Sequence, residues 1–200
     1  MPKPPILPTI NWKVVFDSGK SYPDWLLDGE SPENRQNPEA ASYRPAADME
    51  TIRNGLTLDP HVIGLLRAVP RAVHVIAIAE DWCGDVVRHV PVLQKLADAS
   101  SNLHVRYVSR EQWPDVFTRF LTNGGEAIPK FIFLSDKFVE CGNWGPMPDM
   151  CRELIARGKA CGDVPAARKK VSGLYEADHN KRMVVAELIH LIDIASSTSP

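Results

Sequence analysis

The sequence predicts a single α/β domain built on a mixed four-stranded sheet with helices on both faces. A near-continuous apolar run rich in β-branched residues, "VHVIAIA" at 73–79, is typical of a central strand covered on both faces. Helical periodicity follows it, and then a strand, a helix and two short strands in turn. A β-α-β unit that continues through a helix into an antiparallel hairpin gives such a sheet.

Composition and charge limit the kind of protein. The 200 residues are 44% hydrophobic and 24% charged, which suits one globular domain with a sizeable core. A formal net charge of −2, with no long basic run, gives no reason to expect nucleic acid or a membrane surface as a partner. The start "MPKPPILPTINW" is broken by proline, and no segment reaches the roughly 18 apolar residues of a membrane span. We therefore expect a cytoplasmic protein.

The first part of the chain predicts little regular structure. Residues 1–45 are rich in proline and short polar residues, so we expect an extended N-terminal arm. One short helical turn is expected near "PDWLL", with Trp12, Tyr22 and Trp25 holding the arm to the domain. From Asp48 onward, apolar spacing predicts helical segments interrupted at Asn54-Gly55 and near Asp59-Pro60.

The elements after the first strand follow from periodicity and from turn residues. Pro114 suits the first position of a helix, and Asn123-Gly124-Gly125 its end. Two short strands meet in a tight hairpin at Asp136-Lys137. The expected elements are helices over 84–99, 114–125, 148–157, 165–176 and 181–194, and strands over 103–109, 130–135 and 137–144.

This order predicts how the domain is organised. We expect the N-terminal arm over 1–45, the main domain with a leading helix over 46–162, and a C-terminal helical extension over 163–200 packed on the same domain. The helix after the hairpin, over 148–157, is expected to close the main domain. The extra C-terminal helices are expected to cover a sheet face or edge, or to form a homodimer contact.

A cysteine lies where the first strand passes into a helix, in "EDWCGD" at 80–85. The cysteines at 83, 141, 151 and 161 form no Cys-x-x-Cys pair, so we expect reduced thiols. In the first turn of a helix, a thiol lies beside unpaired N–H groups and the positive end of the helix dipole, which favour the thiolate. Nearby acidic side chains act in the opposite direction.

These residues resemble the thioredoxin-like superfamily, in particular bacterial thioredoxin-family proteins with a single-cysteine Trp-Cys-Gly-Asp site. "EDWCGD" is similar to the Trp-Cys-Gly-Pro-Cys site of the family, and Pro91 falls where its helix often carries a proline. "AIPKFIF" resembles the segment whose proline, Pro129 here, forms a cis peptide facing the active cysteine, and "NWGPMP" resembles the turn after the last strand. The resemblance covers about residues 70–160 and implies a thioredoxin-like fold.

The resemblance implies a site. Cys83 would be the nucleophile, with backbone N–H groups of the next two residues supporting its thiolate, and a disulfide-bearing peptide would pair with the cis-proline segment. The tryptophans would form an apolar rim, or would simply pack the loops. The implied catalytic residues are Cys83, Gly84 and Asp85, and the implied substrate-binding residues are Trp82, Ile128, Pro129, Trp144 and Gly145.

The chain departs from the family at two positions. Val86 occupies the place of the resolving cysteine, and Ala77 that of the buried acid used in proton transfer. The two-thiol cycle therefore cannot run locally, although an external thiol such as glutathione could resolve a mixed disulfide on Cys83. Cys141 is expected to lie beyond the ~7 Å Cα separation that a disulfide permits. We expect no metal or bound cofactor, because the histidines have no ligand spacing.

Three polar residues near these segments each have two interpretations. His89 could act as a base for Cys83, but packing or surface exposure is the simpler interpretation. Asp85 is either a favourable charge at a helix N-terminus or a proton shuttle. Lys130 is either a solvated residue at a strand end or a contact for a glutathione carboxylate.

Two functions follow from the sequence. The first is a thiol-disulfide oxidoreductase of single-cysteine type, acting on a protein or a low-molecular-weight disulfide. The alternative is a non-catalytic thioredoxin-fold protein-binding module, because a fold does not secure a function. A glutathione-dependent transferase or peroxidase is a weaker third class, since no hydroxyl residue lies between Ala77 and Pro91 to polarise a peroxide.

Overall fold

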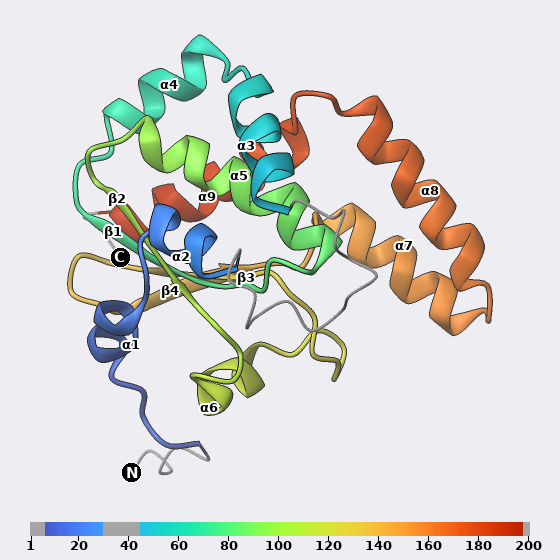
Figure 1. The fold of residues 1–200 in the computed structure, drawn as a ribbon, viewed down its shortest axis with the longest axis horizontal. Helices are drawn as coiled ribbons and strands as arrows, with labels where there is room; N and C mark the ends of the chain where they lie inside the picture. The colour runs from blue at the N-terminus through green and yellow to red at the C-terminus, as the bar shows by residue number, and fades with distance from the viewer. Residues whose placement is uncertain (1–6, 30–44, 198–200) are drawn as a thin grey trace.

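A four-stranded mixed sheet with helices on both faces forms the protein (Figure 1). The structure is a computed structural model that describes residues 7–29 and 45–197. The strands are β1 (Val73–Ile78), β2 (Leu103–Val108), β3 (Lys130–Leu134) and β4 (Glu140–Trp144), in the order β2-β1-β3-β4. β1 runs parallel to β2 and antiparallel to β3, and β3 runs antiparallel to β4. The predicted α/β fold is confirmed.

The two inner strands account for the position of the core. β3 is buried at every residue and β1 at every residue except His74, which is half-buried. Strands with apolar side chains on both faces need cover on both faces, which places them in the middle of the sheet. β1 was predicted as a central strand on this ground, and the prediction is confirmed.

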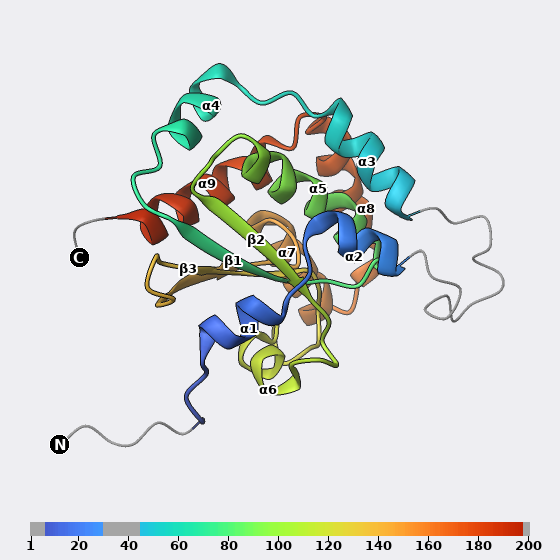
Figure 2. The ribbon, with the colours of Figure 1, turned by 60° about the vertical axis from the view of Figure 1, so that its left-hand side comes forward.

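Helices cover the two faces unequally, as Figure 2 shows. One face carries α5 (Gly84–Asp98) and α9 (Arg182–Ser196), and α3 (Pro45–Gly55) and α4 (Pro60–Arg67) lie outside them. The opposite face carries α1 (Trp12–Ser18) and the short α6 (Pro114–Phe117). α2 (Tyr22–Gly29) packs along β2.

The N-terminal region is more regular than the sequence predicts. The helical turn expected near "PDWLL" is confirmed as α2, whose Tyr22 and Trp25 rings pack on Tyr107 of β2 at centroid distances of 5.7 and 5.0 Å. The expectation of an otherwise extended arm is wrong over 12–18, where α1 forms. Its N-cap Asn11 accepts the backbone N–H of Val14, a local signal that proline-rich surroundings obscured. Residues 1–6 and 30–44 of the predicted arm lie outside the described residues.

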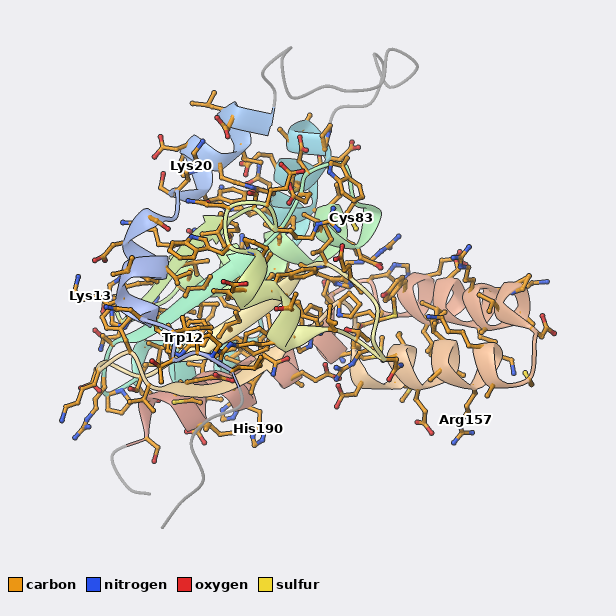
Figure 3. All side chains as sticks on the ribbon, turned by 90° about the horizontal axis from the view of Figure 1, so that it is seen from below. Trp12, Lys13, Lys20, Cys83, Arg157 and His190 are labelled. Carbon is orange, nitrogen blue, oxygen red and sulfur yellow. The ribbon has the colours of Figure 1, made fainter. Side chains whose placement is uncertain are left out.

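The helix that closes the sheet is not the expected one. α7 (Asp149–Ala160) follows the hairpin but packs against α8 (Val164–Ala177), and the two form a helical hairpin that projects from the domain (Figure 3). The predicted boundary at 162–163 falls inside this hairpin. α9 covers the sheet, because its Val184, Leu188 and Ile192 recur with helical spacing and are buried. The expectation that a C-terminal helix covers a sheet face is therefore confirmed for α9.

Two boundaries differ from the predictions for reasons of backbone geometry. The helix expected over 114–125 is α6 followed by a 3₁₀ turn, η2 (Thr118–Phe120). It ends early because Thr122 and Gly125 exchange two backbone hydrogen bonds across a tight turn. β4 begins at Glu140, not at 137, because Ser135 Oγ accepts the N–H of Val139 and holds a longer loop.

Candidate functional site

Cys83 lies at the N-cap of α5, where β1 leads into the helix (Figure 3). Its N–H donates to the Glu80 carbonyl at 3.1 Å, and its carbonyl accepts the N–H of Val87 at 3.0 Å. The thiol is partly exposed, and its Sγ lies 3.6 Å from the carbonyl oxygen of Ile128. The backbone of the strand-helix junction therefore holds this thiol against the segment that precedes β3.

The segment beside the thiol contains the cis peptide that the resemblance implied, between Ile128 and Pro129. Gly145, at the end of β4, packs against it with φ +118°, and a Cβ at this position would lie 2.0 Å from the Pro129 carbonyl oxygen. Only glycine fits this approach. The structure therefore brings Cys83, Ile128, Pro129 and Gly145 together, as the sequence predicts.

Trp82, the residue before Cys83, is exposed, with 60% of its surface accessible. The Arg110 guanidinium lies 5.4 Å from its ring centroid. The Arg110 N–H donates to Glu80 Oε1 at 2.9 Å, and its side chain approaches Glu126 at 3.4 Å. Sequence reasoning missed Arg110, because its partners lie on two other loops, Glu80 and Trp82 after β1 and Glu126 before β3, and no local pattern links these loops.

Trp144 does not belong to the exposed rim. It is 2% exposed, its ring stacks on Phe131 at 5.2 Å, and its Nε1–H donates to Glu187 Oε2 at 2.6 Å. Of the two interpretations of the tryptophans, burial supports packing for Trp144 and not a place in an apolar rim with the substrate-binding residues. A buried indole N–H requires a hydrogen-bond partner, and here the partner comes from α9.

Gly84 and Asp85 form the first turn of α5. Gly84 is exposed and Asp85 partly buried. Burial raises the pKa of Asp85, and the Arg88 charge lowers it. Burial and then the Asp85 charge raise the pKa of Tyr175 on α8, and burial raises the pKa of Cys151 on α7. The prediction of a proton shuttle to Cys83 has no contact to support it.

His89 is a packing residue in the interior. It is fully buried, its Nε2 lies 3.2 Å from Tyr175 Oη, and its ring meets Trp144 edge-on at 5.2 Å. Burial, followed by the charges of Arg88 and Lys181, lowers the pKa of His89 to about 3. The packing interpretation is confirmed, and a neutral buried imidazole of this kind offers Cys83 no base.

The other three cysteines are also free thiols. Cys141 lies next to the residue that pairs with Phe133, whereas Cys83 contacts the chain at Ile128. The four β3 residues from Lys130 to Phe133, at ~3.3 Å each, alone separate the two points by about 13 Å, well beyond disulfide range. Cys151 is buried on α7, and Cys161 is exposed at its C-terminal end.

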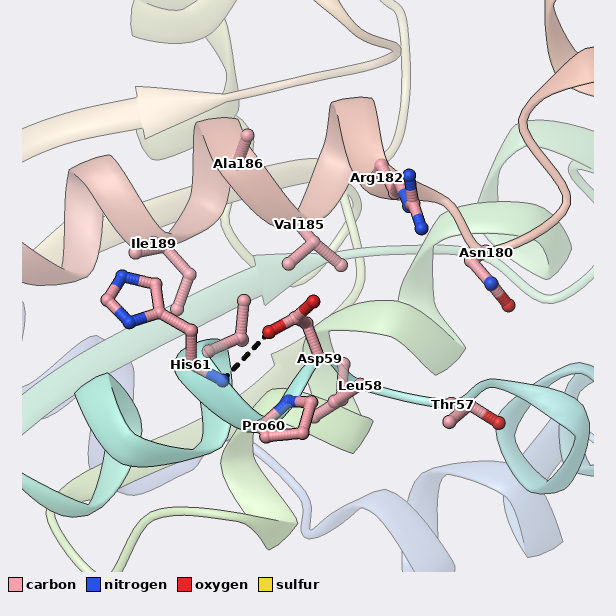
Figure 4. A pocket seen from close by; sticks show the side chains of 11 residues that line it. Thr57, Leu58, Asp59, Pro60, His61, Asn180, Arg182, Val185, Ala186 and Ile189 are labelled. Carbon is pink, nitrogen blue, oxygen red and sulfur yellow. Dashed lines mark hydrogen bonds between the residues drawn. The ribbon is translucent and has the colours of Figure 1, made fainter.

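A groove of about 670 Å³ lies elsewhere, between the start of α4 and α9 (Figure 4). Asp59 caps α4 there by accepting the His61 N–H at 2.8 Å, and Val185 and Ile189 of α9 form the facing wall. None of the residues that line it belongs to the cysteine site. Within 7–29 and 45–197, no group of three or more His, Cys, Asp or Glu side chains could hold a metal ion.

No helix in the described part of the chain combines the length and the apolar character needed to cross a membrane.

The sheet order, the thiol at the start of α5 and the cis-proline segment facing it define a thioredoxin-like protein. The thioredoxin family model matches residues 34–163, which is more than half of the chain, and the chain belongs to this family. No curated protein matches it.

Two solved structures share the fold. A 1.5 Å crystal structure of a protein of unknown function, PA1234 from Pseudomonas aeruginosa, is 16% identical with a TM-score of 0.65, covering 92% of this chain and 98% of that one. A crystal structure of an HIV epitope-scaffold is 15% identical with the same TM-score and the same coverage. At these identities the likeness shows the fold alone.

Proposed function

We propose that the protein is a thiol-disulfide oxidoreductase of single-cysteine type with Cys83 as its nucleophile. One observation carries the proposal: a partly exposed thiol at the start of α5 lies 3.6 Å from the carbonyl that precedes the cis Pro129. A helix N-terminus favours the thiolate, and the adjacent extended segment offers backbone groups to a peptide. The membership of the thioredoxin family is in keeping with this chemistry.

The reaction is an exchange in two steps. The Cys83 thiolate attacks one sulfur of a substrate disulfide, forming a Cys83–S–S–R bond and breaking the substrate S–S bond, and the other half leaves as a thiolate that takes up a proton. An external thiolate, for which glutathione is our candidate, then attacks the sulfur of R. A disulfide between R and the external thiol forms, and Cys83 leaves as a thiolate. The net change is one disulfide exchanged for another.

The surroundings of Cys83 support a substrate that is held beside the thiol. Trp82 offers a large exposed apolar surface on the same loop. In the thiol form, Cys83 Sγ donates to the Ile128 carbonyl. Ionisation of Cys83 would release this carbonyl, which could then accept an N–H from an incoming peptide. We propose a protein or low-molecular-weight disulfide as the substrate.

The experiment is a mixed-disulfide assay on the full chain. Wild type, Cys83→Ser and Cys161→Ser are mixed with a peptide disulfide, and the adducts are located by peptide mass spectrometry before and after glutathione is added. We expect an adduct on Cys83 that glutathione removes, in wild type and in Cys161→Ser but not in Cys83→Ser. Equal reaction at Cys83 and at the exposed Cys161 would contradict the proposal.

The second candidate is a non-catalytic protein-binding module. The exposed Trp82 favours it, since a large aromatic side chain on a loop is a frequent anchor in protein interfaces. Burial of Val86 at the place of a resolving cysteine favours it too. In that case Trp82→Ala would abolish partner binding, whereas Cys83→Ser would leave it unchanged.

A further inference from the structure

Lys130 is buried where a solvated or glutathione-contacting lysine was expected. It is the first residue of β3, directly after Pro129, and only 3% of its surface is exposed. Its Nζ donates to the Gly145 carbonyl oxygen at 2.6 Å. Both interpretations from the sequence are therefore wrong, because the side chain turns inward to the end of β4.

The carbonyl that Lys130 binds belongs to the cysteine site. Gly145 packs so closely on Pro129 that a Cβ would lie 2.0 Å from the Pro129 carbonyl oxygen. The preceding carbonyl, that of Ile128, faces Cys83 Sγ. A continuous path of contacts thus runs from the ammonium through Gly145 and the cis-proline segment to the thiol.

Burial of the charged Lys130 side chain is unfavourable, so its position in the interior requires an explanation. Removing an ammonium from water costs several kcal/mol unless other contacts compensate, and an uncharged side chain of the same length would fill this space without that cost. Arg152 of α7 adds a second cation, since its Nη1 lies 3.4 Å from the same carbonyl oxygen. Two cationic donors therefore fix the position of one carbonyl.

Resting on the proposed function, we propose that Lys130 is a positioning residue of the cysteine site. By holding the Gly145 carbonyl, it keeps the Ile128-Pro129 segment in the position that aligns a peptide disulfide with Cys83 Sγ. It does not touch the reacting atoms. The rate at which Cys83 reacts with a peptide that pairs with the Ile128-Pro129 segment should therefore depend on Lys130. The rate with a small reagent that needs only the thiol should not.

The protonation of Lys130 gives the proposal a pH signature. Burial, with the Arg152 charge, lowers the pKa of Lys130 to about 8. Asp149 forms an ion pair with Arg152, and Glu187 of α9, also near Arg152, accepts hydrogen bonds from the Trp144 Nε1–H and the Asp149 N–H. Loss of the proton converts a charge-assisted hydrogen bond into a weaker neutral one.

The test compares two rate constants of Cys83: that with a peptide disulfide and that with iodoacetamide. Both reactions use the thiolate, so their ratio cancels the ionisation of Cys83 itself. We expect Lys130→Met to lower this ratio at least tenfold at pH 7, and Lys130→Arg to keep it within about threefold of wild type. Lys137→Met, at an exposed lysine in the β3-β4 loop, is the matched control and should leave the ratio unchanged.

The pH dependence separates positioning from a merely structural role. In wild type the ratio should fall several-fold between pH 7 and pH 9.5, whereas in Lys130→Met it should be low and flat. A wild-type ratio that is flat with pH, or a Lys130→Met ratio equal to that of wild type, would overturn the inference.

A separate measurement distinguishes failure of this inference from failure of the proposed function. If wild-type Cys83 reacts with the peptide disulfide no faster than Cys161, the proposed function fails. Amide hydrogen exchange then tests the positioning itself. Lys130→Met should speed exchange in residues 127–130 but not in the loop at 135–139, and unchanged exchange in both would refute it.

Discussion

Acid should lower the free energy of unfolding of the protein, because His89 is buried in its neutral form. The imidazole is fully buried, and its pKa falls from 6.5 to about 3 in the folded state. The unfolded chain therefore takes up a proton below pH 6.5, whereas the folded chain does so only near pH 3. The stability contributed by the neutral imidazole is complete above pH 6.5 and is lost progressively as the pH falls toward 3.

The loss of stability in acid can be calculated from the shift in the pKa of His89. pH 5 lies about 1.5 units below the pKa of His89 in the unfolded chain. At 1.36 kcal/mol per unit, the free energy of unfolding falls by about 2 kcal/mol. At pH 4 the same reasoning gives about 3.4 kcal/mol. Losses of this size are a large fraction of the stability of an ordinary domain.

The assay is urea unfolding at pH 7 and pH 5, followed by tryptophan fluorescence. His89→Gln provides the comparison, because it keeps a polar side chain that does not titrate. Carboxylates titrate in both proteins, so their contribution cancels in the difference. We expect wild type to lose about 2 kcal/mol more than His89→Gln between the two pH values. Equal losses in the two proteins would refute the reasoning.

Three further predictions concern packing and charge. Gly145→Ala should destabilise the fold by about 2–4 kcal/mol in thermal unfolding, because its Cβ would strike the Pro129 carbonyl, whereas Gly173→Ala, with open space around it, should be neutral or slightly stabilising. Leu188→Ala should cost about 2–5 kcal/mol, as expected for a core side chain, and a cost below 1 kcal/mol would show that α9 is peripheral. Between pH 8 and 10.5 the unfolded state binds the Lys130 proton more readily than the folded state, so stability rises with pH in this range. In chemical unfolding, the free energy of unfolding of wild type should rise by about 2 kcal/mol from pH 7.5 to 9.5, and that of Lys130→Met should lack this rise.

The sequence predicts best what depends on local pattern. β1 and α5 are correct because their apolar residues recur with the periods of a central strand and of a helix packed on a sheet. The junction at Cys83 follows from these two elements. The cis peptide before Pro129 was implied by the resemblance, and so was a place for Gly145 in the site, where the structure shows it packed against Pro129.

Features that depend on distant partners were not predictable in this way. The sequence left open whether Trp144 forms an apolar rim or packs the loops, because its partner, Glu187, lies 43 residues further along the chain. Both interpretations of Lys130 assumed an accessible side chain, because no local pattern shows that a carbonyl 15 residues later accepts a hydrogen bond from its ammonium. The choice of closing helix failed for the same reason, although the richer apolar face of α9 was a usable signal.

The α7-α8 hairpin delays the covering of one face of the sheet during synthesis. β4 ends at Trp144, but the helix that covers this face with α5 is finished only at Ser196. At 5–20 residues per second, the ribosome needs roughly 3–10 s to make the intervening segment. Throughout that interval one side of β3 and β4 has no cover from α9. A nascent chain of this protein therefore offers chaperones an apolar sheet surface for several seconds, a window that a direct connection from β4 to α9 would shorten.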